Sequence, residues 1–286
     1  MATRRCQAAA MASRYPRLGC GALAAALRAQ GATWPWRLRV VSTCASTEPL
    51  LQGWARQGGH GPSAVVARHQ RHGRGQWGRS WCAPPGGVWV SAAWPFHRSA
   101  AAAPLQTEGL GLAVAVAVME WLERLGLPVA FKWPNDILLE QRKLAGLLAH
   151  RQLRGGAPQQ LGMGLGLNVA NAVPVGAVAL RQRLGTRTPS LPQAQAAVLL
   201  ACERAMVLLE QPDALVQACQ DRLWLPQQPL VGTTGAPVRV VGLTPNGGLR
   251  LLQQDGRTAV VHHGTWRLPA PSLGRFSAAP LPPRQD

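Results

Sequence analysis

A run of glycine and arginine is the first part of the sequence whose residue types could do chemistry. Residues 72–81 read His-Gly-Arg-Gly-Gln-Trp-Gly-Arg-Ser-Trp, with Arg74 and Arg79 among three glycines. Glycine lets the backbone approach a ligand closely, and arginine brings a fixed positive charge to an anion. The run predicts a phosphate-handling loop, although it is also typical of solvated loops and of nucleic-acid binders. We expect a flexible basic lid over residues 69–81, between two strands.

A second segment, residues 131–137, combines a cation, an amide and a carboxylate. Lys132 ends an apolar stretch, and Asn135 and Asp136 follow it after Trp-Pro. An ammonium neutralises a carboxylate or an α-phosphate, while amide and carboxylate oxygens suit Mg²⁺ or a triphosphate. The alternative is that Asn-Asp only caps a β-turn. Lys132 and Lys143 are the two lysines of an otherwise arginine-rich chain, which favours sites that need a compact ammonium.

The composition is that of a globular protein with a basic charge. Its 286 residues are 47% hydrophobic, and the formal net charge is +18. Such a charge favours nucleic acid or an anionic partner, but the arginines are spread along an Ala-, Gly- and Pro-rich chain. Six cysteines show no Cys-x-x-Cys pair and no metal-ligand spacing, which favours a reduced, cytoplasmic compartment. The longest apolar run, residues 110–122, is too short to span a bilayer and predicts a buried helix.

The hydrophobic pattern predicts a mixed β-sheet with helices on one side, an α+β architecture. Expected strands lie at 38–42, 64–68, 88–92, 129–133, 136–139, 144–149 and 161–169, and expected helices at 47–57, 104–125, 193–210 and 212–223. Residues 161–169 alternate glycine with leucine or methionine, which leaves one sheet face bare for a ligand or another backbone. Short strands at 238–243, 248–253 and 258–261 predict a small β-barrel-like module.

Five segments, in this order along the chain, resemble the biotin protein ligase family (biotin–acetyl-CoA-carboxylase ligases). They are 42–46 (Ser-Thr-Cys-Ala-Ser), 73–81, 132–137, 143–148 (Lys-Leu-Ala-Gly-Leu-Leu) and 164–169 (Gly-Leu-Gly-Leu-Asn-Val). The resemblance covers about residues 38–268, and residues 1–33 are too few for the winged helix-turn-helix of bifunctional members. It implies a catalytic biotin- and ATP-binding domain (34–225) and an SH3-like β-barrel (226–269). The composition predicts a disordered basic extension (1–33) and a disordered Pro-rich tail (270–286).

The resemblance implies a two-step reaction. Biotin and ATP, with Mg²⁺, form biotinyl-5′-AMP, and the biotinyl group is then transferred to a lysine of a biotin carboxyl carrier protein. Two alternatives stay open: a lipoate protein ligase, similar in fold and reaction, and an Arg-rich nucleic-acid-binding protein whose affinity would fall steeply with salt. We expect a cytoplasmic protein that binds neither specific DNA nor a membrane, and whose basic surface attracts an acidic carrier domain. The sequence leaves the oligomeric state open, a homodimer included.

The resemblance also assigns roles to single residues. The expected catalytic residues are Lys132 and Arg74, at the reacting carboxylate and α-phosphate. The expected biotin-binding residues are Ser42, Thr43, Cys44, Gln70, Arg74, Gly75, Gln76 and Lys132. The expected ATP-binding residues are Arg74, Arg79, Trp81, Asn135, Asp136, Lys143 and Asn168. Asp136 is also the expected Mg²⁺ ligand and a candidate for the base that deprotonates the acceptor lysine.

Three positions depart from the family's pattern. Cys44 stands where asparagine is frequent, Gln76 where arginine is frequent, and His150 where an acid is frequent. We expect Cys44 to pack rather than to react. The missing cation at Gln76 is expected to loosen the hold on the adenylate, unless Arg79 compensates.

Overall fold

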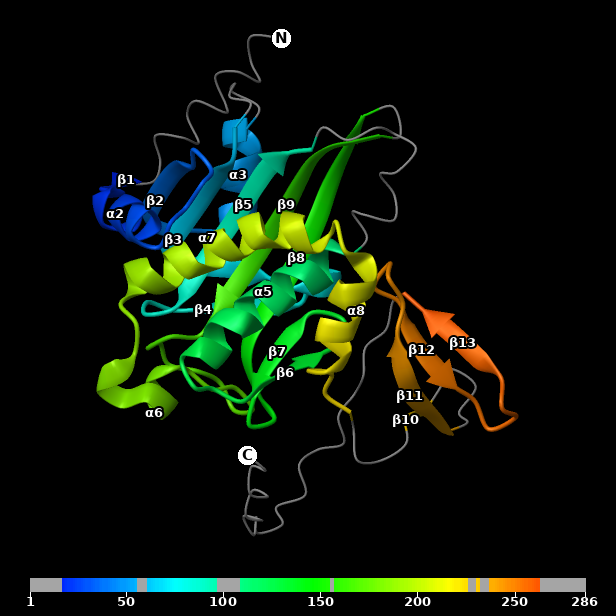
Figure 1. The fold of residues 1–286 in the computed structure, drawn as a ribbon. Helices are drawn as coiled ribbons and strands as arrows, with labels where there is room; N and C mark the ends of the chain where they lie inside the picture. The colour runs from blue at the N-terminus through cyan, green and yellow to red at the C-terminus, as the bar shows by residue number, and fades with distance from the viewer. Residues whose placement is uncertain are drawn as a thin grey trace.

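A nine-stranded mixed sheet forms the centre of the protein (Figure 1). The computed structural model describes residues 17–55, 61–96, 109–154, 157–225, 230–231 and 237–262. The strand order is β1-β2-β3-β5-β9-β8-β7-β6, and β4 pairs with β3 alone. The strands are β1 (Arg17–Leu18), β2 (Arg37–Cys44), β3 (Ser63–Arg74), β4 (Ser80–Ala83), β5 (Val88–Pro95), β6 (Val129–Lys132), β7 (Asp136–Leu139), β8 (Arg142–Arg154) and β9 (Ala157–Leu167). Strands β2 and β3 are parallel and the other neighbours antiparallel, which confirms the expected mixed sheet.

Most helices cover one face of this sheet. They are α2 (Gly21–Ala29), α3 (Thr47–Ala55), α5 (Leu110–Arg124), α6 (Arg181–Leu184), α7 (Leu191–Leu208) and α8 (Pro212–Gln220). Helix α5 lies against the sheet and α7 crosses it on the outside (Figure 1). Helix α3 is the exception, because its Leu51 packs with Val65 and Ala93 on the opposite face. That opposite face therefore stays largely open.

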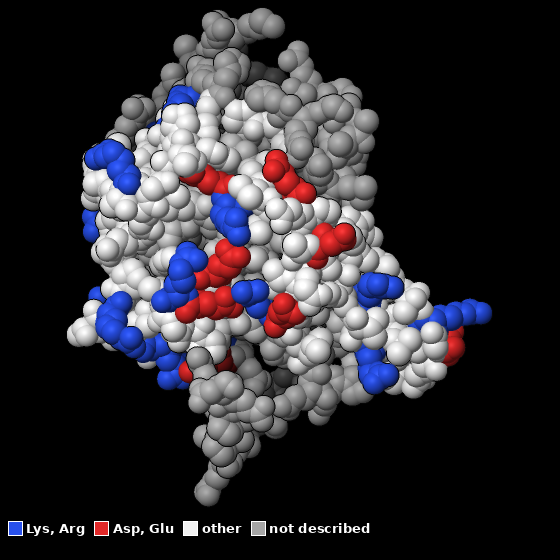
Figure 2. Space-filling view, viewed as in Figure 1, with Lys and Arg blue, Asp and Glu red and all other residues white. Residues whose placement is uncertain are grey.

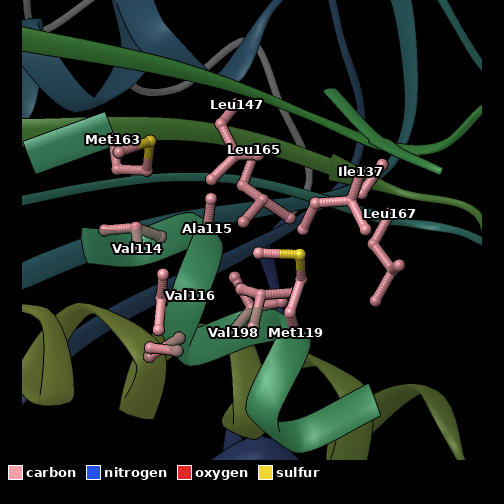
Figure 3. Close-up of a cluster of buried hydrophobic side chains, with 14 of the residues drawn as sticks. Val114, Ala115, Val116, Met119, Ile137, Leu147, Met163, Leu165, Leu167 and Val198 are labelled. Carbon is pink, nitrogen blue, oxygen red and sulfur yellow. The ribbon is translucent and has the colours of Figure 1, made fainter. Parts of the chain in front are cut away.

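The main hydrophobic core fills the space between the sheet and α5. Val114, Ala115 and Met119 of α5 face Met163 and Leu165 of β9 (Figure 3). Helix α5 is apolar on nearly all sides because the sheet covers one side and α7 another, as expected for a buried helix. The first part of the helix expected at 104–125 lies outside the described residues.

The N-terminal boundary differs from the expected one. Residues 17–18 form β1, which pairs with β2, and residues 21–29 form α2, which packs against α7. Leu23 and Leu27 of α2 are buried in the main core, because alanine and leucine at helical spacing give this segment an apolar face. Residues 17–29 are therefore part of the fold rather than of an extension. The rest of that expected extension, residues 1–16, lies outside the described residues.

A smaller antiparallel sheet follows the helices. Its strands are β10 (Leu230–Val231), β11 (Pro237–Leu243), β12 (Leu249–Leu252) and β13 (Thr258–Val261), in that order. Trp133 links it to the main sheet, because its Nε1 donates a hydrogen bond of 2.8 Å to the carbonyl oxygen of Gly247. Leu243 and Leu249 also join the main core. Residues 263–286, including the expected tail, lie outside the described residues.

The helix-covered face mixes acidic and basic side chains (Figure 2). Arg222 pairs with Glu123 at 2.6 Å, and Arg204 pairs with Glu120 at 3.6 Å. The described part of this face therefore has no continuous basic surface for a nucleic acid. None of the helices among the described residues is long and apolar enough to cross a membrane.

Candidate active site

A pocket of about 150 Å³ opens on the sheet face opposite α5. Its walls come from the start of α3, the β3–β4 hairpin, β5, β7, β8 and β9. The residues that line it include Ser46, Thr47, Glu48, Gln70, Arg74, Gly75, Gln76, Arg79, Trp81, Ser91, Asn135, Asp136, Lys143, Gly146, Leu148, Gly164 and Gly166. Nine predicted site residues are among them, drawn from distant parts of the sequence. They are Gln70, Arg74, Gly75, Gln76, Arg79, Trp81, Asn135, Asp136 and Lys143.

Glycines form the floor of this pocket. A Cβ added at Gly166 would lie 2.5 Å from Cε2 of Trp81, and one added at Gly146 would lie 2.7 Å from Cζ3 of the same ring. The indole therefore lies flat on the sheet, which only glycine at these two positions permits. A Cβ added at Gly164 would meet nothing closer than 3.6 Å. The alternating glycines leave the bare face that their pattern predicts, and part of it is covered by the protein's own tryptophan.

The basic segment forms a hairpin rather than the flexible lid expected over residues 69–81. Strand β3 runs on to Arg74 and pairs with β4, so that Gly73 lies opposite Trp81. Only residues 75–79 form the turn, closed by a hydrogen bond of 2.8 Å from the Gly75 nitrogen to the Arg79 oxygen. At its tip, Trp77 has a φ of +59° and is 66% exposed. The hairpin register holds Trp81 over the floor.

The two lysines occupy different positions around Asp136. Lys143 lines the pocket, where its Nζ lies 2.6 Å from Oδ1 of Asp136 and 4.9 Å from the centre of the Trp81 ring. Lys132 lies opposite Asp136 in the β6–β7 pair but is not among the lining residues. Burial lowers the pKa of Lys132, and the charge of Asp136 opposes this shift. Of the two lysines, Lys143 is the one that lines the pocket.

A set of neutral hydrogen-bonding side chains, from Thr47, Gln70 and Ser91, also lines the pocket. The backbone nitrogen and Oγ1 of Thr47 both donate to Oε1 of Gln70, at 2.8 and 3.1 Å. Oγ1 of Thr47 also lies 2.7 Å from Oγ of Ser91, in a hydrogen bond. The sequence reasoning missed Ser46, Thr47 and Ser91. The signal for the first two was a second Ser-Thr pair at the start of the expected helix.

Besides Lys132, four predicted site residues lie outside the pocket lining. Ser42 and Thr43 belong to β2, before the chain reaches the pocket at Ser46. Cys44 is 1% exposed among Val41, Ala67 and Leu50, and burial raises the pKa of its thiol to about 11. It therefore stays protonated and packs, as expected.

Asn168, the fourth of these residues, has structural partners. It is 4% exposed, and its Oδ1 accepts a hydrogen bond of 3.0 Å from Nδ2 of Asn171. Its Nδ2 lies 3.4 Å from the carbonyl oxygen of Lys143, and its backbone nitrogen donates to Leu144. In this structure Asn168 thus holds the strand that carries Lys143.

Asp136 fits a Mg²⁺ ion only in part. No group of three His, Cys, Asp or Glu side chains able to hold a metal occurs among the described residues. Magnesium bound to a nucleotide, however, needs only one or two carboxylates, because phosphate oxygens and water supply the other ligands. The carboxylate of Asp136, in a pocket that Arg74 and Arg79 also line, is compatible with that arrangement.

The segment that builds the pocket also matches known proteins. Residues 40–168 match the sequence model of the Biotin/lipoate A/B protein ligase family. This segment is thus similar to biotin/lipoate protein ligase domains. This segment is 38% identical over 109 residues to the bifunctional ligase/repressor BirA of Escherichia coli. The match covers 37% of this chain and 33% of BirA. It is 36% identical over 128 residues to the biotin–[acetyl-CoA-carboxylase] ligase of Paracoccus denitrificans. That match covers 41% of this chain and 49% of the Paracoccus protein.

Solved structures support the same assignment at the level of the fold. The biotin protein ligase of Aquifex aeolicus, solved with biotin and ATP, has a TM-score of 0.64 at 24% identity and covers 80% of this chain and 96% of that protein. This similarity confirms the expected fold. The chain matches about a third to a half of the length of these curated relatives.

Proposed function

We propose that this chain is an ATP-dependent biotin protein ligase that modifies a lysine of a biotin carboxyl carrier protein. The observation that carries the proposal is the polarity of the pocket. One side offers neutral hydrogen-bonding groups, from Thr47, Gln70 and Ser91, and the other offers cations, from Lys143 and Arg74. Biotin has a neutral ureido head, an apolar chain and a carboxylate, in that order. Its head would meet the first group and its carboxylate the second.

The first step joins two anions, so its catalysis depends on fixed positive charge. A carboxylate oxygen attacks the α-phosphorus of ATP, a new oxygen–phosphorus bond forms, and pyrophosphate leaves. Lys143, Arg74 and Arg79 would stabilise the charge that gathers at the α-phosphate. Asp136 would hold Mg²⁺ together with phosphate oxygens, and the ion would neutralise the triphosphate. Because Lys143 lies in the pocket, we assign it the catalytic role expected of Lys132, which remains a prediction.

The second step transfers the acyl group. The acceptor amine, once neutral, attacks the acyl carbon, and AMP leaves as the carbon–oxygen bond breaks. The intermediate is a mixed anhydride that water hydrolyses, so a closed site protects it. The hairpin tip at 75–79 and the ring of Trp81 would exclude water here. Asp136 is engaged by Lys143 at 2.6 Å, which suits it to orient that lysine better than to accept the amine's proton.

A lipoate ligase is the second function that this domain supports, because the family model covers both kinds of enzyme. Lipoate has a carboxylate and an apolar chain but a dithiolane ring in place of the ureido group. The hydrogen-bonding set of Thr47, Gln70 and Ser91 would then have no partner on the ligand. An unpaired polar group in a buried site costs binding energy, which favours biotin.

The test is a direct assay of the acceptor protein. Purified chain, ATP, Mg²⁺ and a biotin carboxyl carrier domain are incubated with biotin or with lipoate, and the acceptor is weighed by mass spectrometry. We expect a biotin-sized increase that requires ATP and is lost in Lys143→Gln. An increase with lipoate alone would assign the second function. No increase with either acid, together with salt-sensitive binding to DNA, would favour the nucleic-acid-binding alternative.

A further inference from the structure

Three glycines alternate along β9, and two of them lie beneath aromatic rings. Gly166 lies under Trp81, as described above. Gly162 lies under the imidazole of His150, since a Cβ added there would overlap that ring, with Cε1 only 2.5 Å away. Gly164, between them, has no ring above it and lines the pocket. The two rings thus bracket the bare part of the floor.

The strand register fixes the order of these groups. Gly146 lies opposite Gly166, Leu148 opposite Gly164, and His150 opposite Gly162. Side chains two residues apart on a strand share a face, so His150 is the next side chain after Leu148, which lines the pocket. The His150 row is therefore the next row beyond the floor.

The row of His150 and Gly162 is covered on the side of β5. Ala93 of β5 lies opposite Gly162, and Leu51 of α3 packs against Ala93. An acid with its carboxylate at Lys143, at the Trp81 end, and its head at Ser91, opposite Gly164, points its far end toward this row. The length available to the acid is then the distance from Lys143 to the row of His150.

We propose that His150 is a specificity-determining residue, whose ring forms the blind end of the acid pocket and sets the length of the acid that fits. The proposal rests on the proposed function, because it takes the carboxylate end from it. The ring is a suitable wall: its Nδ1 is buried and has no hydrogen-bond partner among the described residues. Burial lowers the pKa of His150, and the charge of Glu48 and a backbone hydrogen bond at Leu148 oppose this shift. The wall is therefore neutral near pH 7.

The proposal predicts a change in selectivity between two acids. Biotin and homobiotin, which has one more methylene in its chain, are compared by the kcat/KM of adenylate formation, measured as pyrophosphate release. One methylene in a fitted pocket changes kcat/KM by about 10- to 200-fold. We expect the homobiotin-to-biotin ratio of kcat/KM to rise at least about tenfold in His150→Ala, because removal of the imidazole opens the space over Gly162.

Two further variants separate the shape of the wall from general damage to the fold. In His150→Phe a ring remains, so the preference for biotin should persist. In the double variant His150→Ala/Gly162→Ala, the new methyl group occupies part of the vacated space, so the ratio should fall back toward that of the unchanged chain. A variant that only loosened the fold would lower kcat/KM for both acids and leave their ratio unchanged.

The failure of this proposal differs from the failure of the proposed function. If the unchanged chain adenylates neither acid, the proposed function is wrong. If it adenylates biotin, and His150→Ala has the same homobiotin-to-biotin ratio as the unchanged chain, His150 does not set the length of the pocket. A raised ratio in His150→Phe as large as that in His150→Ala would also overturn the proposal, because the ring would then have no role.

Discussion

Strands β8 and β9 carry different chemistry on their two faces. On one face Met163 and Leu165 are buried against α5, where they contribute to the main core (Figure 3). On the other face Gly164 and Gly166 form a floor that carries only the Trp81 ring and open space. Alternate residues of the same strand thus serve stability and ligand binding separately. Substitutions on the two faces should therefore have separable effects.

The largest expected effect is on the open face, at Lys143. Loss of one group that stabilises transition-state charge lowers kcat by about 10²- to 10³-fold, so Lys143→Gln should lower biotinyl-AMP formation by that factor. Lys132→Gln is the matched control, since Lys132 lies opposite Asp136 in the β6–β7 pair but is not among the residues that line the pocket. We expect a smaller loss there. The rate of pyrophosphate release is measured for each variant. Equal losses of rate in the two variants would contradict the assignment of the main catalytic role to Lys143 rather than to Lys132.

Neighbouring residues of β9 give the sharpest test of the two faces. Met163→Ala should lower the free energy of unfolding by about 2–5 kcal/mol, because it leaves a cavity in the core. Gly164→Ala should change that free energy far less, since the added Cβ has ordinary contacts at 3.6 Å, but it should raise the KM for biotin. Urea unfolding gives the free energy of unfolding of both variants, and initial rates of biotinyl-AMP formation give their KM for biotin. A large loss of stability in Gly164→Ala would show that the faces are not independent.

The sequence predicted these elements well because their hydrophobic patterns are local. Most of the strands, helix α3 and the two helices after residue 190 follow the expected ranges to within a few residues. Strand β4 was missed because it is short, and because its pairing with β3 depends on the glycines of the hairpin. Helix α2 was missed because its alanine-rich sequence also resembles an extension. Its burial is evident only once α7 is placed against it.

The site was predictable in composition but not in detail. The basic hairpin, Asp136 and Lys143 were all expected, and the structure brings them together. The sequence reasoning named the Ser-Thr pair at 42–43, whereas the pair at 46–47 lines the pocket, because the sequence does not show where β2 leaves the sheet. The position of His150 over Gly162 depends on the β8–β9 register, which no local pattern fixes. Contacts between distant segments are what the sequence reasoning lacked.

A third prediction concerns Trp133, which directly follows β6. Trp133 is buried in the main core, and its Nε1 donates to Gly247 of the smaller sheet. Trp133→Phe keeps a ring but removes that hydrogen bond, so it should cost about 1 kcal/mol of stability. The loss should appear first as faster proteolysis within residues 230–262, before the main sheet unfolds. An equal rise in the rate of proteolysis across both sheets would contradict this local role of Trp133.

The smallest effect should be a dependence of stability on pH that arises at His150. Burial holds the pKa of its imidazole below the ordinary value of 6.5, and Glu48 only partly opposes this. In the unfolded chain the imidazole takes up a proton as the pH falls through 6.5, whereas in the folded chain it stays neutral to lower pH. The stabilising contribution is therefore complete above pH 6.5 and is lost as the pH falls toward the folded pKa. Between pH 7.5 and 5.5, the unchanged chain should lose more unfolding free energy than His150→Phe, which has no proton to bind at this position. Parallel curves of unfolding free energy against pH for the two proteins would show that the imidazole is solvated, and that the end wall of the pocket is open to water.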